Sequence, residues 1–177
     1  MTDLRGLQLE TDEHDMLMHP HTGGVILFTR NFESLEQITT LCKRIHDLRQ
    51  PHLLIAVDHE GGRVQRFRDG FSHLPSCASL AKCKTNQDAE SLCQKAGWLM
   101  AAELLAVGVD ISFAPVLDLG GKISNVIGDR AFHTEPDQIS RLAYAYMGGM
   151  KQAGMSAVGK HFPGHGSVFE DSHDDIP

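Results

Sequence analysis

The sequence of 177 residues predicts an α/β fold built on a parallel sheet. Apolar segments alternate with longer segments of helical periodicity, in the order strand, helix, strand, helix, strand, helix, strand. Each expected strand is apolar along its whole length, which is typical of a parallel sheet covered on both faces. Two architectures fit this order: an open, doubly wound sheet, or the first four units of a (β/α)₈ TIM barrel.

The first strand and helix follow a polar N-terminal stretch. A short helix is expected in the segment DEHDMLMHP, ended by Pro20. Residues 23–30 (GGVILFTR) are expected to form the first strand. Apolar side chains recur at spacings of three and four in residues 34–50, which predicts an amphipathic helix. Ser34 is its expected N-cap, with Gln37 placed as in a capping box.

The rest of the chain repeats the same alternation. The second strand (LLIAVDHE) is followed by a long polar connection, and the second helix is expected to end at Gly108. A third strand, a third helix and a fourth strand follow. The expected elements, in order, are residues 53–60, 88–108, 109–119, 137–154 and 155–162.

Composition and charge narrow the class of protein. The net charge of −7 argues against nucleic acid or an anionic membrane as the main partner. No apolar run approaches the length of a membrane helix. The N-terminus lacks the basic and apolar regions of a signal peptide, so a cytoplasmic location is expected. The cysteines form no C-x-x-C pair and are expected to be free thiols; they are Cys42, Cys77, Cys83 and Cys93.

Polar side chains gather where each expected strand ends. In both architectures the active site lies at the carboxyl ends of the strands, so this pattern predicts an enzyme. The strand-end residues are Thr29, Arg30, Asn31, Asp58, His59, Glu60, Asp118, Lys160 and His161. The loops that follow add Arg63, Arg66, Arg68, Asp129 and Arg130.

The segment DHEGGRVQRFR follows the second strand. It matches neither a dinucleotide-binding fingerprint nor a phosphate loop, which argues against nucleotide binding. Gly61 and Gly62 are expected to allow a tight turn and the close approach of a ligand. Asp58 can accept hydrogen bonds from sugar hydroxyls, or it can form a structural ion pair with Arg66.

The segment KHFPGHG leaves a metal site open as an alternative. His161 and His165 resemble a metal-binding pair, which Asp171 or His173 could complete. Pro163 prevents the helix on which such a pair binds zinc well, so a zinc hydrolase is the less favoured interpretation. His165 alternatively serves to hold the loop by hydrogen bonds.

The segment EDSHDD predicts acid/base chemistry. A carboxylate beside an imidazole, here Asp171 and His173, fixes the tautomer and raises the pKa of the histidine toward neutrality. No G-x-S-x-G motif accompanies them, and Ser172 is not an expected nucleophile. A solvated acidic loop is the alternative.

The segments GGVILFTRN, AVDHEGGRVQRFR, DISFAPVLDL and GKHFPGHG, followed by DSH, resemble the family-three glycoside hydrolases. Among these, the chain is similar to bacterial β-N-acetylglucosaminidases over essentially its whole length. The resemblance implies a (β/α)₈ barrel and a retaining, two-step mechanism without metal or cofactor. The implied partner is a small carbohydrate, a GlcNAc-1,6-anhydro-muropeptide from peptidoglycan recycling, with no nucleic acid or membrane partner.

The resemblance also implies roles for individual residues. His173 is the implied acid/base, oriented by Asp171. The residues implied to bind the sugar are Asp58, Arg66, Arg130, Lys160 and His161.

The second carboxylate of a retaining glycosidase is expected outside this sequence. Such an enzyme needs a nucleophile across the sugar from its acid/base. In this family it is an aspartate after a late strand, and a complete barrel takes about 250 residues. Residues 1–177 are therefore expected to be the N-terminal half of one glycoside-hydrolase domain, inactive alone and completed by a further segment or a second chain. The alternative is a non-catalytic GlcNAc-binding remnant.

Overall fold

A computed structural model describes residues 1–177 except 84, 122–123, 168, 170 and 172–177. Its main sheet is parallel, and its strands lie side by side in the order in which they occur along the chain. These strands are β1 (Thr2–Asp3), β2 (Gly24–Leu27), β3 (Leu54–Val57) and β6 (Ile111–Ser112). The predicted parallel sheet is therefore confirmed. Strand β1 was not predicted, because its two residues are polar.

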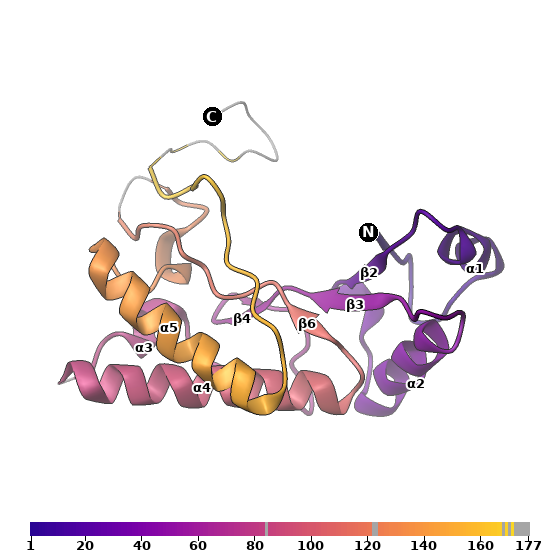
Figure 1. The fold of residues 1–177 in the computed structure, drawn as a ribbon, viewed down its shortest axis with the longest axis horizontal. Coiled ribbons are helices and arrows are strands. Elements are labelled where there is room, and N and C mark those ends of the chain that lie inside the picture. The colour runs from indigo at the N-terminus through magenta and orange to yellow at the C-terminus, as the bar shows by residue number, and fades with distance from the viewer. Residues whose placement is uncertain (84, 122–123, 168, 170, 172–177) are drawn as a thin grey trace.

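The longer helices lie together on one side of the sheet. Figure 1 shows α2, α4 and α5 on the same side of β2, β3 and β6. A doubly wound sheet reverses its strand order and carries helices on both faces, so this arrangement is that of a barrel segment. The helices are α1 (Thr11–Met18), α2 (Leu35–His46), α3 (Cys77–Leu80), α4 (Asn86–Ala106) and α5 (Pro136–Ala153), with 3₁₀ turns η1 (Thr29–Asn31) and η2 (Gly128–Arg130).

The fourth expected strand, residues 155–162, forms only a single parallel bridge, between Val116 and Lys160. The segment still runs beside the continuation of β6: Val158 N–H donates to the Ala114 carbonyl at 2.9 Å. Pro115 lies in the facing segment and has no N–H, so a regular ladder cannot form there. β6 is also much shorter than the expected strand 109–119, and its pairing with β3 ends where β3 ends, at Val57.

The ends of the helices follow the predicted chemistry in most respects. Ser34 Oγ accepts the N–H of Gln37 at 3.1 Å, which confirms the N-cap of α2. The Gln37 side chain accepts the N–H of Glu33, not that of Ser34, so the capping box is wrong by one residue. Gly108 (φ 91°) follows α4, as predicted, and Gly154 (φ 99°) ends α5 in a left-handed conformation that favours glycine.

An antiparallel hairpin lies between β3 and α3 and was not predicted. It pairs β4 (His59–Gly61) with β5 (Val64–Gln65). Gly61 and Gly62 turn the chain with φ values of 99° and 56°, which confirms the tight turn. The atoms that approach them belong to the protein: a Cβ on Gly61 would lie 2.5 Å from the carbonyl oxygen of Pro75.

The core fills the space between the sheet and its helices. Val25, Leu27 and Ile55 of the sheet and Ile38 and Ile45 of α2 are fully buried. All four cysteines are unpaired, which confirms the prediction of free thiols. Within the described residues, no helix combines the length and apolar character needed to cross a membrane.

Candidate active site

Asp58 and Lys160 meet at the carboxyl end of the sheet. Asp58 follows β3 directly, and Lys160 lies at the bridge to Val116. Lys160 Nζ donates to Asp58 Oδ1 at 2.7 Å and lies 2.5 Å from Glu60 Oε1. Because parallel strands end at one edge of a sheet, residues 102 positions apart are brought into contact.

Glu60 is the buried anion that joins this lysine to Arg130. Arg130 Nε and Nη2 donate to the two carboxylate oxygens of Glu60 at 2.9 and 2.8 Å, a bidentate pair. The side chain of Glu60 is 2% exposed and that of Arg130 is 11% exposed. Burial by itself lowers the pKa of Arg130, but the hydrogen bonds and charge of Glu60 outweigh it and raise that pKa further. Arg130 is therefore held in place by protein contacts.

Arg66 lies on the other side of Asp58. Its Nη2 is 3.6 Å from Asp58 Oδ2, so the predicted ion pair forms. Its Nε is buried and has no hydrogen-bond partner among the described residues. The guanidinium carbon also lies 5.9 Å from the centre of the Phe28 ring. Arg66 thus keeps an unused donor beside a carboxylate.

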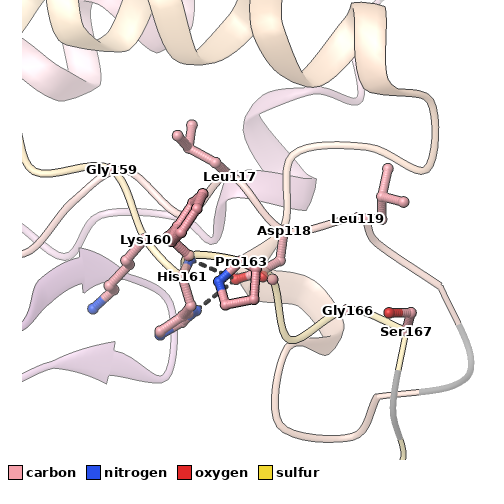
Figure 2. A pocket seen from close by; sticks show the side chains of 11 residues that line it. Leu117, Asp118, Leu119, Gly159, Lys160, His161, Pro163, Gly166 and Ser167 are labelled. Atoms are coloured by element: carbon pink, nitrogen blue, oxygen red, sulfur yellow. Dashed lines mark hydrogen bonds and ion pairs between the residues drawn. The ribbon is translucent and has the colours of Figure 1, made fainter.

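Asp118 holds the segment KHFPGHG in place. His161 Nδ1 lies 2.5 Å from Asp118 Oδ2, and the backbone N–H of His165 donates to Oδ1 at 2.6 Å, as Figure 2 shows in part. The peptide bond between Lys160 and His161 is cis. Burial raises the pKa of the Asp118 carboxyl, but the hydrogen bonds from His161 and His165 outweigh burial and hold it below its ordinary value. The buried carboxylate therefore fixes the His161 ring.

A cavity of about 400 Å³ lies over this segment. Lys160, His161 and Asp118 are among the residues that line it, and Figure 2 shows the side chains of His161 and Asp118 pointing toward each other. Its lining combines the two polar strand ends with a short apolar rim, which includes Leu117, Leu119 and the almost fully exposed Phe162. Such a mixed polar and apolar lining suits a small polar ligand with a ring.

The predicted acid/base pair is not tested by these contacts. His173 lies outside the described residues, so the structure does not describe its relation to Asp171. The alternative zinc site shares this position. Among the described residues, His161 and His165 belong to no group of three metal-ligating side chains. Their ring centres are 6.2 Å apart.

Sequence reasoning assigned no role to Glu60 or Asp118, although both were noted as polar strand ends. The structure makes each of them the centre of a hydrogen-bond network. The signal was available in principle: an acidic residue directly after an apolar strand is costly to bury unless it is paired. The identity of the partners depends on loop paths that sequence does not show.

The chain was compared with protein families and with curated proteins. The family description "Glycosyl hydrolase family 3 N terminal domain" matches residues 1–177. A protein of Thioalkalivibrio sulfidiphilus named beta-hexosaminidase is 61% identical over 100% of this chain and 52% of its own length.

Solved structures of similar proteins point to the same family. The native crystal structure of NagZ from Neisseria gonorrhoeae has a TM-score of 0.96 and 47% sequence identity, covering 100% of this chain and 53% of that one. A second structure of that protein, in complex with N-trifluoroacetyl-D-glucosamine, has the same TM-score and identity. The chain thus spans about half the length of the curated relatives that it matches.

Proposed function

This chain belongs to glycosyl hydrolase family 3, and we propose that it forms the sugar-binding half of a β-N-acetylhexosaminidase active site. The parallel sheet fits the TIM-barrel-like fold of this family, and we infer that residues 1–177 form the first half of such a domain. The observation that carries the proposal is the convergence of Asp58, Lys160 and Arg66 at the carboxyl edge of the sheet. A carboxylate accepts from two neighbouring hydroxyls, while the lysine and arginine donate to the oxygens beside them.

The groups around Asp58 have capacity left for a ligand. The Arg66 Nε has no partner among the described residues, and a buried donor of this kind is satisfied when a ligand oxygen reaches it. His161 is held by Asp118 through Nδ1, which leaves its Nε2 side directed away from that carboxylate. We assign Asp58, Arg66, Lys160 and His161 to direct sugar contacts. Arg130, held by its bidentate pair with Glu60, adds a further positive charge to the site.

The substrate that we propose is a terminal GlcNAc on a 1,6-anhydro-muropeptide of peptidoglycan recycling. The complex of the Neisseria relative with N-trifluoroacetyl-D-glucosamine supports a GlcNAc-type ring. The cytoplasmic location stays a prediction.

We propose a retaining mechanism in which His173, oriented by Asp171, protonates the leaving oxygen and then activates water. A retaining mechanism also needs a nucleophilic carboxylate on the opposite side of the sugar. Asp58, Glu60 and Asp118 are each engaged by cations or by the loop that they hold. We therefore propose that a segment outside residues 1–177 supplies the nucleophile, as the greater length of the relatives allows.

Binding is tested with a matched pair of lysine variants. Lys160→Gln removes the ammonium between Asp58 and Glu60, whereas Lys151→Gln removes an exposed ammonium at the end of α5. A charged hydrogen bond contributes about 1.5–3 kcal/mol, so calorimetry with GlcNAc should show about tenfold or greater weakening for Lys160→Gln alone. Equal affinities in the two variants would contradict the site.

Turnover is tested with a chimera. Residues 1–177 are joined to the C-terminal half of the Thioalkalivibrio relative, and release of 4-nitrophenol from the aryl β-GlcNAc glycoside is measured for the chimera and for residues 1–177 alone. We expect turnover from the chimera only. Turnover by residues 1–177 alone would place the nucleophile inside them. A folded chimera that binds GlcNAc without turnover would favour the non-catalytic remnant.

A further inference from the structure

His46, His52 and Asp110 form a cluster of metal-ligating side chains outside the candidate active site. One ligand atom from each lies within 4.8 Å of the other two. His46 is the last residue of α2, His52 precedes β3, and Asp110 precedes β6. These residues lie where the strands begin, whereas Asp58 and Lys160 lie where strands end. The cluster is therefore separate from the sugar-binding residues.

Two of the three side chains are already in place. His46 Nε2 lies 3.0 Å from Asp110 Oδ2. Asp110 is fastened to the sheet in both directions, because its N–H donates to the Ile55 carbonyl at 2.9 Å and its Oδ2 accepts the Ile55 N–H at 2.7 Å. A carboxylate has about four lone-pair sites, so it can keep the Ile55 bond and still bind a cation. Both side chains are 26% exposed, which leaves a route for an ion.

The third side chain is near and free to adjust. His52 is exposed, its ring centre lies 4.9 Å from that of His46, and it makes no hydrogen bond to a described residue. In a tetrahedral zinc site with ligand distances near 2.1 Å, ligand atoms lie about 3.4 Å apart. Rotation of an exposed side chain can close the difference from 4.8 Å without moving the backbone.

We propose that His46, His52 and Asp110 bind a divalent transition-metal ion of the zinc type, with water as the remaining ligand. Two imidazole nitrogens and one carboxylate oxygen are ligands that Zn²⁺ takes in proteins, whereas Mg²⁺ and Ca²⁺ prefer oxygen alone. The C-terminus of a helix is the negative end of its dipole, so the end of α2 also favours a cation. The ion takes the place of the hydrogen between His46 Nε2 and Asp110 Oδ2, and the neutral imidazole then carries its N–H at Nδ1.

The consequence of binding is structural. The ion would join the end of α2 to the segments that precede β3 and β6. Without the ion, the His46–Asp110 hydrogen bond links the end of α2 to the segment that precedes β6. A metal that binds only the folded state stabilises it in proportion to the logarithm of its concentration over its dissociation constant. Bound metal would therefore stabilise the folded state at the end of the sheet where β3 and β6 begin.

The test uses zinc chloride titrated into the chelator-treated protein, followed by calorimetry, with cobalt(II) absorption as a second probe. We expect one ion at this site, with His52→Ala weakening its binding by about tenfold or more. His21→Ala is the matched control, since His21 is an exposed histidine that lies against His19. Asp110→Asn keeps an acceptor for the Ile55 N–H while removing the negative charge, and should also weaken binding.

Imidazole NMR signals decide where the ion sits. Zinc should shift the ring signals of His46 and His52 and leave those of His161 unchanged. The proposal is overturned if no zinc binds, if His52→Ala binds zinc as the unaltered protein does, or if the ion is lost only on His161→Ala. Because His52 is exposed, loss of binding in His52→Ala with an unchanged circular dichroism spectrum cannot be assigned to unfolding.

Discussion

Glu60 and Arg130, 70 residues apart in sequence, form a bidentate ion pair that is almost completely buried. Lys160 Nζ contacts the same carboxylate, 2.5 Å from Oε1. A single carboxylate thus contacts two cations, and both cations belong to the proposed sugar site. Glu60 is therefore a positioning residue, because its charge determines where Arg130 and Lys160 can lie.

Removing this anion should be costly. Glu60→Ala leaves the poorly solvated Arg130 without its bidentate partner and removes one of the two carboxylates beside Lys160. Loss of one partner of a buried pair costs about 3–5 kcal/mol. Asp129→Ala is the control, since Asp129 is about half exposed and lies 3.5 Å from Arg63. That surface pair should contribute at most about 1 kcal/mol. Urea unfolding measures both free energies, and a similar small loss in each variant would contradict the assigned role.

Asp118 should give the folded state a dependence on acid pH. Its folded pKa lies below the ordinary value of 3.8, so the unfolded chain binds the proton more readily. The stabilisation is fully present above the ordinary pKa and is lost as the pH falls through the folded value. The free-energy difference between the protein and Asp118→Asn should be constant above about pH 5 and shrink below about pH 4. Urea unfolding across this range measures it, and a difference independent of pH would contradict the prediction.

His59 should destabilise the protein in mild acid. Burial, followed by the charge of Arg68, lowers its pKa from 6.5 to about 4. Between these values the unfolded chain takes up a proton that the folded chain does not, so stability falls as the pH falls. The loss by pH 4 is about 3 kcal/mol.

The matched variant for this prediction is His59→Phe. The His59 ring packs against Phe67 and Phe71, with centres 5.9 and 5.6 Å away, and its Nδ1 is buried without a hydrogen-bond partner among the described residues. A phenyl ring keeps the packing and removes the titration. Thermal unfolding at pH 7 and pH 5 should show the advantage of the variant growing at the lower pH. An equal difference at both values would mean that His59 does not titrate as stated.

The helices and the convergence of the strand ends could be predicted from the sequence, because both follow from local patterns of residues. Apolar spacing and caps placed α2, α4 and α5 within a few residues of their observed ends. The meeting of Asp58 with Lys160 followed from the parallel order alone. Strand lengths were overestimated because apolar runs do not report pairing, and Pro115 interrupts the ladder that two such runs would have formed.

The partners inside the site were harder to predict. Asp118 accepts a hydrogen bond from the backbone of a loop 47 residues later in the chain. Glu60 pairs with Arg130, although several other arginines lie in the same loops. These choices depend on the path of the chain between strands, which no periodicity describes. The metal-ligating cluster was missed for a related reason, since His46, His52 and Asp110 are spread over 64 positions and meet only through strand pairing.

The contact between α4 and α5 offers a test with two adjacent glycines as each other's control. A Cβ on Gly149 would lie 1.9 Å from the Gln94 carbonyl oxygen and 2.7 Å from the Trp98 nitrogen, both backbone atoms. A Cβ on Gly148 meets nothing within 4 Å. Both residues are inside α5, where alanine is favoured over glycine by about 0.8–1.0 kcal/mol.

The two substitutions should therefore have opposite signs. Gly148→Ala should stabilise the protein by up to about 1 kcal/mol, because only the helix propensity changes. Gly149→Ala must push the two helices apart, and overpacking of this kind costs about 1–3 kcal/mol or more. Urea unfolding at neutral pH measures both free energies. If Gly149→Ala is as stable as Gly148→Ala, the helices do not approach as closely as the structure requires. A loss in both variants would instead indicate that the exposed face of α5 is covered at Gly148.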